Sequence, residues 1–104
     1  MKCTQFVHTL PLKVEWDPKK APANLKKHGI DFADAAVALE DFNALTIEDE
    51  SHDEQRFKTV ALGPNLSVLL IVHAPQGAET VRIISARKAN RAETRQYYRG
   101  IRHE

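Results

Sequence analysis

Cysteine is almost absent from this 104-residue sequence, which contains only Cys3. A single cysteine excludes a disulfide within the chain and is typical of a reducing compartment. The sequence also lacks paired cysteines and an HExxH motif, so we expect no structural zinc site and no other cofactor.

Long apolar runs are also missing, because the longest, at 68–72, is too short to span a bilayer. The start of the sequence lacks the apolar core of a signal peptide. With 42% hydrophobic and 28% charged residues, the composition is that of a globular protein. We expect one domain over 1–104, without membrane contact and located in the cytoplasm.

The formal net charge is only +1, but the charges are unevenly distributed. Residues 31–54 contain nine acids and no lysine or arginine, whereas residues 82–102 contain seven lysines or arginines and one acid. The acidic segment is expected to be a solvated face, with contact to a basic partner protein as the alternative. The basic segment indicates an anionic partner.

Local patterns predict the secondary structure. Strands are expected at 6–16, 44–48, 56–62, 67–74 and 80–87, with the apolar run at 67–74 in the centre of the sheet. One helix is expected to start at Asp17-Pro18, with a first turn distorted by Pro22, or to start at Pro22 itself, and to stop at Gly29. A second is expected from an Asp31 cap to 41. The order β-α-α-β-β-β-β-α predicts an α+β fold, in which two N-terminal helices and one C-terminal helix pack on a largely antiparallel sheet of four or five strands.

The stretch 81–98 joins the last strand to the basic helix. In the strand, Val81, Ile83 and Ser85 alternate with the intervening residues, so the two sets should face opposite sides of the sheet. Asn90 and Glu93 form a capping-box pattern at the start of the helix. The helix then presents arginines four residues apart, at 91, 95 and 99.

Two further features allow both a functional and a plain structural interpretation. The cations of Lys26-Lys27-His28 would complement the C-terminal dipole of the first helix. Arg82 lies in an apolar strand and is expected to be partly enclosed, so it needs an anion. That anion is either an internal carboxylate such as Glu48 or a bound phosphate.

Several sequence blocks resemble the BrnT toxins. They are Glu15-Trp16-Asp17 with Lys20 and Asn24, Lys27-His28-Gly29-Ile30 with Phe32, Glu54 and Arg56, and the run from Arg82 to Ala89 followed by Glu93 and Tyr97. The resemblance covers about 14–98, so residues 1–13 form an extra segment before a BrnT-like domain at 14–104. Pro22 departs from the pattern.

The resemblance implies a RelE-like ribonuclease toxin of a type II toxin–antitoxin system that blocks translation. It also implies a BrnA-like antitoxin, which neutralises the toxin and, in complex with it, binds operator DNA. RNA is then the substrate.

Metal-independent cleavage of RNA needs proton transfer and fixed positive charge at the phosphorus, while the RNA supplies its own 2′-hydroxyl nucleophile. His28 is the first candidate for proton transfer. His73, which is more typical of a buried core histidine, and Glu54 are lesser candidates. The candidates for binding the phosphate and stabilising the transition state are Lys27, Arg56, Arg82 and Arg87.

The last helix is a candidate RNA-binding surface through Arg91, Arg95 and Arg99, with Tyr97 or Tyr98 stacking on a base. A tyrosine in this position also commonly docks a helix on its sheet. The alternative to catalysis is a non-catalytic module that binds nucleic acid or protein through the same basic strand and helix. A further alternative is that the arginines mainly form a docking surface for an acidic antitoxin segment.

Overall fold

The protein is an α+β domain whose structure, a computed structural model, describes residues 13–50 and 53–102. Within these ranges the elements are β1 (Lys13–Trp16), α1 (Lys20–His28), α2 (Phe32–Ala38), β2 (Leu45–Asp49), β3 (Arg56–Leu62), β4 (Val68–Pro75), β5 (Thr80–Lys88) and α3 (Arg91–Arg102). The predicted order of elements is confirmed. The part of the predicted 6–16 strand before 13 lies outside the described residues, as does nearly all of the extra segment 1–13.

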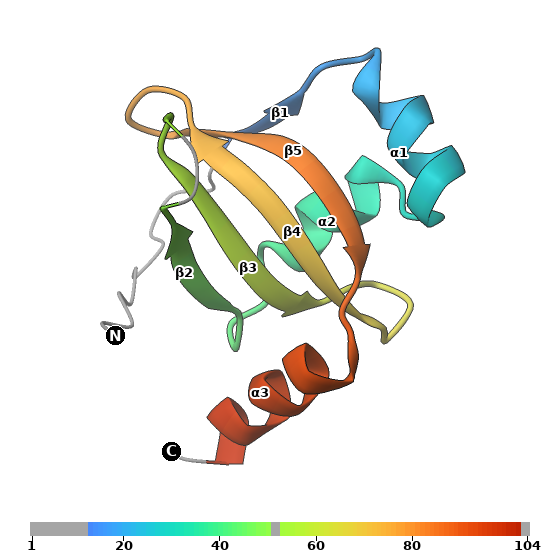
Figure 1. Cartoon of the computed structure of the whole chain (residues 1–104), viewed down its shortest axis with the longest axis vertical. Helices are drawn as coiled ribbons and strands as arrows, with labels where there is room; N and C mark the ends of the chain where they lie inside the picture. Colours follow the sequence, from blue (N-terminus) through green and yellow to red (C-terminus); the bar gives the residue numbers. More distant parts are fainter. Residues whose placement is uncertain (1–12, 51–52, 103–104) are drawn as a thin grey trace.

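The strands form one five-stranded sheet in the order β1-β5-β4-β3-β2 (Figure 1). All neighbouring strands are antiparallel except β1 and β5, which are parallel. Strand β4 occupies the centre, and its apolar residues are buried at most positions. Both the central position of this strand and the largely antiparallel sheet agree with the sequence prediction.

Helices cover both faces of the sheet, which we call the α2 face and the α3 face. In Figure 1, α2 lies behind the strands and α3 crosses near one end of the sheet. The larger core, on the α2 face, contains Ile30, Phe32, Ala35, Ala38, Ala61, Leu69, Ile71, Ile83 and Ala86. The smaller core, on the α3 face, contains Val60, Val68, Leu70 and Tyr97.

Helix α1 begins at Lys20, after a turn formed by Asp17 and Pro18. The Asp17 carboxylate accepts a hydrogen bond from the Lys19 N–H at 2.9 Å, and its backbone carbonyl accepts one from Lys20 at 2.9 Å. Asp17-Pro18 therefore forms a turn before the helix, which begins at Lys20, between the two expected starts at Pro18 and Pro22. Pro22 falls in the first helical turn, where a missing N–H breaks no intrahelical bond.

The junction between α1 and α2 follows the predicted signals. Gly29 has a left-handed φ of 75°, and its N–H donates to the Leu25 carbonyl at 2.8 Å. Asp31 then caps α2 by accepting a hydrogen bond from the Ala33 N–H at 2.9 Å. Helix α2 ends at Ala38, a few residues earlier than expected.

Helix α3 is capped at its start and attached to the rest of the fold near its middle. At its start, the Asn90 and Glu93 side chains each accept a hydrogen bond from the other residue's backbone N–H at 2.8 Å, so the capping box is confirmed. Further along, the Tyr97 hydroxyl donates to Asp41, whose carboxylate also accepts from the Leu62 N–H at 2.9 Å. Burial, together with the hydrogen bond to Asp41, raises the pKa of Tyr97. No helix in the described part of the chain is long and apolar enough to cross a membrane.

Candidate active site

A bulge in β5 brings its two arginines to the same face of the sheet. Arg87 follows Arg82 by five positions, an odd offset, so regular alternation would place them on opposite faces. The register between β4 and β5 shifts at Val72/His73, which leaves one extra residue in β5. As a result, Arg87 lies opposite Leu70 and Arg82 opposite Ala74, and both arginines share the α3 face.

The bulge also corrects the alternation expected for this strand. Ser85 lies opposite Val72 and therefore shares the α3 face with the arginines, instead of following Ile83. Ile83 and Ala86 both enter the core of the α2 face, where they are 1% and 0% exposed. Strict alternation predicted that Ser85 would share a face with Ile83, and Ala86 with Arg82. The one extra residue in β5 moves every later side chain of the strand to the other face.

Glu54 joins the arginines of two strands. Its carboxylate lies 3.0 Å from the Arg56 Nε at the start of β3 and 3.5 Å from the Arg82 Nη2 on β5. Arg82 is partly enclosed, as expected, but its carboxylate partner is Glu54 and not Glu48. Glu54 is thus a bridging anion between two cations.

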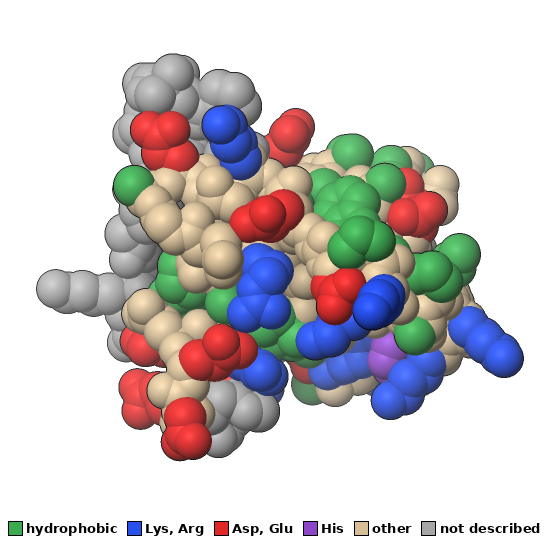
Figure 2. Space-filling view, turned by 90° about the horizontal axis from the view of Figure 1, so that it is seen from above, with side chains coloured by type: hydrophobic (Ala, Val, Ile, Leu, Met, Phe, Trp, Pro, Cys, Tyr) green, Lys and Arg blue, Asp and Glu red, His purple; other side chains and the backbone are tan. Residues whose placement is uncertain are grey.

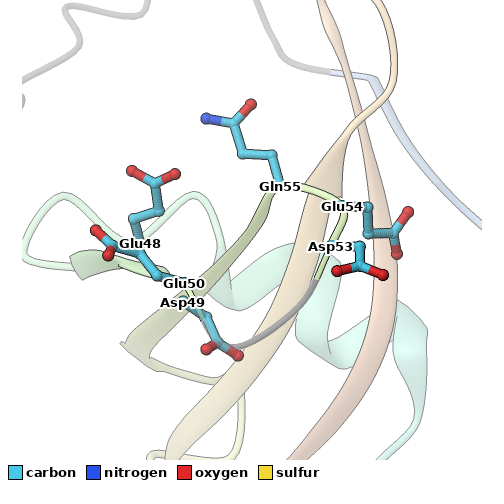
Figure 3. A pocket seen from close by; sticks show the side chains of 6 residues that line it. All are labelled: Glu48, Asp49, Glu50, Asp53, Glu54 and Gln55. Atoms are coloured by element: carbon cyan, nitrogen blue, oxygen red, sulfur yellow. The ribbon is translucent and has the colours of Figure 1, made fainter.

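The surroundings of Glu54 are strongly acidic. Glu54 belongs to a pocket at the turn between β2 and β3 that is lined by Glu48, Asp49, Glu50, Asp53, Glu54 and Gln55. Figure 3 shows that the Glu54 side chain points away from Glu48 and Glu50. Among the described residues, no group of His, Cys, Asp and Glu side chains is arranged to hold a metal ion.

Arg87 has a closer partner than Arg82. Its guanidinium donates two hydrogen bonds to the Glu93 carboxylate, both at 2.9 Å, and a third to the Lys88 carbonyl at 3.0 Å. The bidentate hydrogen bond raises the pKa of Arg87 and lowers that of Glu93. Glu93 therefore pairs with an arginine on β5, not with one on its own helix, and this pair ties α3 to the sheet.

Helix α1, which carries Lys27 and His28 in its last turn, lies beside β5 (Figure 1). Lys27 is exposed and His28 is half-buried at the last turn of the helix. The space-filling view in Figure 2 shows a histidine among several lysine and arginine side chains. The structure thus attaches the helix that carries Lys27 and His28 to the strand that carries Arg82 and Arg87.

His73 faces the opposite side of the sheet from the arginines. It is 9% exposed, its Nε2 lies 2.7 Å from the Thr59 hydroxyl, and its ring stacks on Phe57 with centroids 5.9 Å apart. Burial lowers its pKa to about 4. These contacts agree with a core histidine and separate His73 from the other candidates.

The two tyrosines of α3 differ in accessibility. Tyr97 is only 2% exposed and bonds to Asp41, so it docks the helix and cannot stack on an RNA base in this conformation. Tyr98 is 46% exposed. Arg91, Arg95 and Arg99 are exposed along the outer side of the helix.

The sequence interpretation missed two residues near these candidates. Lys58 shares the α3 face, because it lies opposite Val72 in β4, and its Nζ is 4.0 Å from the Asp49 carboxylate. Strand alternation from Arg56 would have identified it. Asn24 belongs to the quoted sequence blocks but had no assigned role, and the structure buries it against β5.

Known proteins of one family resemble this chain in sequence and in structure. A family model described as the ribonuclease toxin BrnT of type II toxin–antitoxin systems matches residues 16–93. The crystal structure of the Brucella abortus ribonuclease toxin BrnT is similar, with 27% sequence identity and a TM-score of 0.59. The similarity covers 77% of this chain and 99% of that toxin. Among curated protein sequences, none matches.

Proposed function

Because this chain belongs to the BrnT family of ribonuclease toxins of type II toxin–antitoxin systems, we propose that it cleaves RNA without a metal ion and thereby inhibits translation. The observation that carries the proposal is the Arg56–Glu54–Arg82 arrangement on the α3 face. Two guanidinium groups from different strands converge there on one carboxylate. An RNA phosphate carries the same charge and presents similar acceptor oxygens.

In the proposed reaction, the RNA 2′-hydroxyl attacks the adjacent phosphorus and the bond to the 5′-oxygen breaks. The products are a 2′,3′-cyclic phosphate and a 5′-hydroxyl. Arg56 and Arg82 stabilise the charge that develops on the phosphoryl oxygens, with Lys27 as a further cation. His28 transfers protons to or from the reacting oxygens, and Glu54 is the second group able to accept one.

Arg87 receives a different role. Its two hydrogen bonds to Glu93 compete with any contact to phosphate. We therefore assign it first to holding α3 on the sheet, and only second to catalysis. His73, buried on the α2 face, takes no part in the proposed reaction.

The family implies an antitoxin partner as well as an RNA substrate. We propose that a BrnA-like antitoxin neutralises the toxin by covering the basic α3 face, and that operator DNA is bound only by the complex. The exposed arginines of α3 support a role for this surface in binding RNA or the antitoxin. Neither role requires a cofactor.

Purified toxin, free of its partner, is the direct test. Incubated with RNA in EDTA, it should produce fragments that end in 2′,3′-cyclic phosphate. His28→Ala and Arg82→Ala should each abolish cleavage, as well as growth arrest on expression, without loss of folding by circular dichroism. Lys19→Ala, which removes an exposed lysine before α1, is the matched control and should remain active.

Two outcomes would contradict the proposal. Intact RNA after incubation with and without ribosomes would remove the enzymatic assignment. If filter binding then detects a complex that weakens with salt, the protein is a non-catalytic RNA-binding module. Full activity in either folded variant would exclude that residue from the mechanism.

A further inference from the structure

Helix α1 is anchored to the sheet by a polar side chain. In α1, which the structure describes in full, Asn24 is the one buried residue and is 8% exposed. Leu25, which would be the natural apolar anchor, remains 47% exposed. A surface helix is ordinarily attached through an apolar stripe of several residues. Only Ala21 of α1 packs, partly buried, against the core of the α2 face, so the position of α1 depends strongly on the hydrogen bonds of Asn24.

Those hydrogen bonds go to two separate backbone segments. The Asn24 Nδ2 donates to the carbonyls of Ile30 at 3.0 Å and Ala86 at 2.9 Å, and its Oδ1 accepts from the Ala86 N–H at 3.2 Å. Strand β1 pairs with β5 as far as Ile83, so at Ala86 the amide takes the place of a neighbouring strand. Both amide donors are used.

The two contacts enclose the segment that carries the proposed proton-transfer group. Lys27 and His28 lie between Asn24 and Ile30, so one side chain connects the residues before and after them. His28 follows Asn24 by four residues and therefore lies on the same side of α1, which faces β5. On the strand, Ala86 immediately precedes Arg87.

We propose that Asn24 is a positioning residue of the active site. It acts through Lys27 and His28, whose distance and orientation relative to the arginines of β5 it determines. The inference rests on the proposed function, since it needs the Lys27-His28 segment to act in catalysis. A positioning role differs from a purely stabilising one in its effect on turnover. Loss of Asn24 should lower kcat more than does a substitution elsewhere in the fold that lowers stability by the same amount.

The test uses two variants and one control. Asn24→Ala removes all three hydrogen bonds, whereas Asn24→Asp keeps the acceptor but sets a carboxylate against two carbonyl oxygens. Phe32→Leu is the control: Phe32 is fully buried in the core of the α2 face, so its truncation lowers stability and leaves the basic residues unchanged. All three are assayed on the same fluorescent RNA, below the melting temperature that circular dichroism gives for each.

Turnover should separate the variants from the control. We expect kcat to fall roughly 10- to 100-fold in the Asn24 variants with little change in KM, as misplacement of a catalytic group produces. Phe32→Leu should keep the wild-type kcat despite a similar fall in Tm. Asn24 variants with the kcat of the control would overturn the proposal.

A second readout does not depend on cleavage. The imidazole NMR signals of His28 should shift in Asn24→Asp and stay in place in Phe32→Leu. Unchanged His28 signals in folded Asn24→Asp would refute the positioning role even if activity falls. If His28→Ala remains fully active while these signals shift, the proposed function of His28 fails and the structural link from Asn24 stands.

Discussion

Acid should destabilise this protein through His73 at a pH well above the titration range of most carboxyl groups. The imidazole is 9% exposed, and burial lowers its pKa to about 4 from the ordinary value of 6.5. Its Nε2 is bonded to the Thr59 hydroxyl, which in turn lies 2.7 Å from the Thr46 hydroxyl. This chain of hydroxyls offers the charged ring no counter-ion.

The sign of the effect follows from proton uptake. Below pH 6.5 the unfolded chain binds a proton at His73 that the folded protein does not, so stability falls as the pH decreases. A pKa of about 4 in place of 6.5 corresponds to about 3 kcal/mol when acidification is complete. Between pH 7 and pH 5 the free energy of unfolding should decrease by about 2 kcal/mol through this residue alone.

Urea unfolding at pH 7 and pH 5 measures this change. His73→Gln keeps an amide near the Nε2 position but does not titrate, so it should lose most of the pH dependence. The hydrogen bond with Arg87 lowers the pKa of Glu93. Protonation of Glu93 therefore destabilises the protein only at a pH below this interval. An equal loss of stability in wild type and His73→Gln over this interval would refute the argument.

Two further perturbations test other parts of the structure. Gly29→Ala should lower the free energy of unfolding by about 1 kcal/mol, because alanine is strained at the φ of 75° that Gly29 adopts. An added Cβ would meet no atom within 4 Å, so no steric clash adds to this strain. An unchanged Tm would contradict this prediction. Changing Arg91, Arg95 and Arg99 together to glutamine should weaken RNA binding uniformly and make the negative slope of log K against log salt shallower by about 2. If the slope keeps its value, α3 does not contact the RNA.

Much of the fold was predictable because its signals are local. The left-handed stop at Gly29, the Asp31 cap and the Asn90–Glu93 capping box each depend on a few neighbouring residues. The buried strand at 67–74 was recognisable from its apolar composition. Such signals determine where elements begin and end, and the order of the elements indicated the α+β class.

The candidate site was less predictable because it depends on distant contacts. The bulge that places Arg82 on the same face as Arg87 leaves no mark in the alternation of β5. The partner of Arg82 was expected to be either an internal carboxylate such as Glu48 or a bound phosphate, and identifying Glu54 requires the geometry of the turn before β3. Asn24 reaches Ala86 across 62 positions of sequence, and a helical asparagine gives no hint of that partner.

Arg82 and Arg87 appeared equivalent in the sequence, but their partners make them differ as candidates for binding phosphate. The 3.5 Å pair of Arg82 with the exposed Glu54 contributes at most about 1 kcal/mol, so an RNA phosphate can replace that carboxylate at little expense. Arg87 would have to give up two hydrogen bonds of 2.9 Å to Glu93. Glu93 also caps α3 through the Asn90 N–H. Substrate contact with Arg87 therefore disturbs the attachment of α3, whereas contact with Arg82 leaves the fold intact.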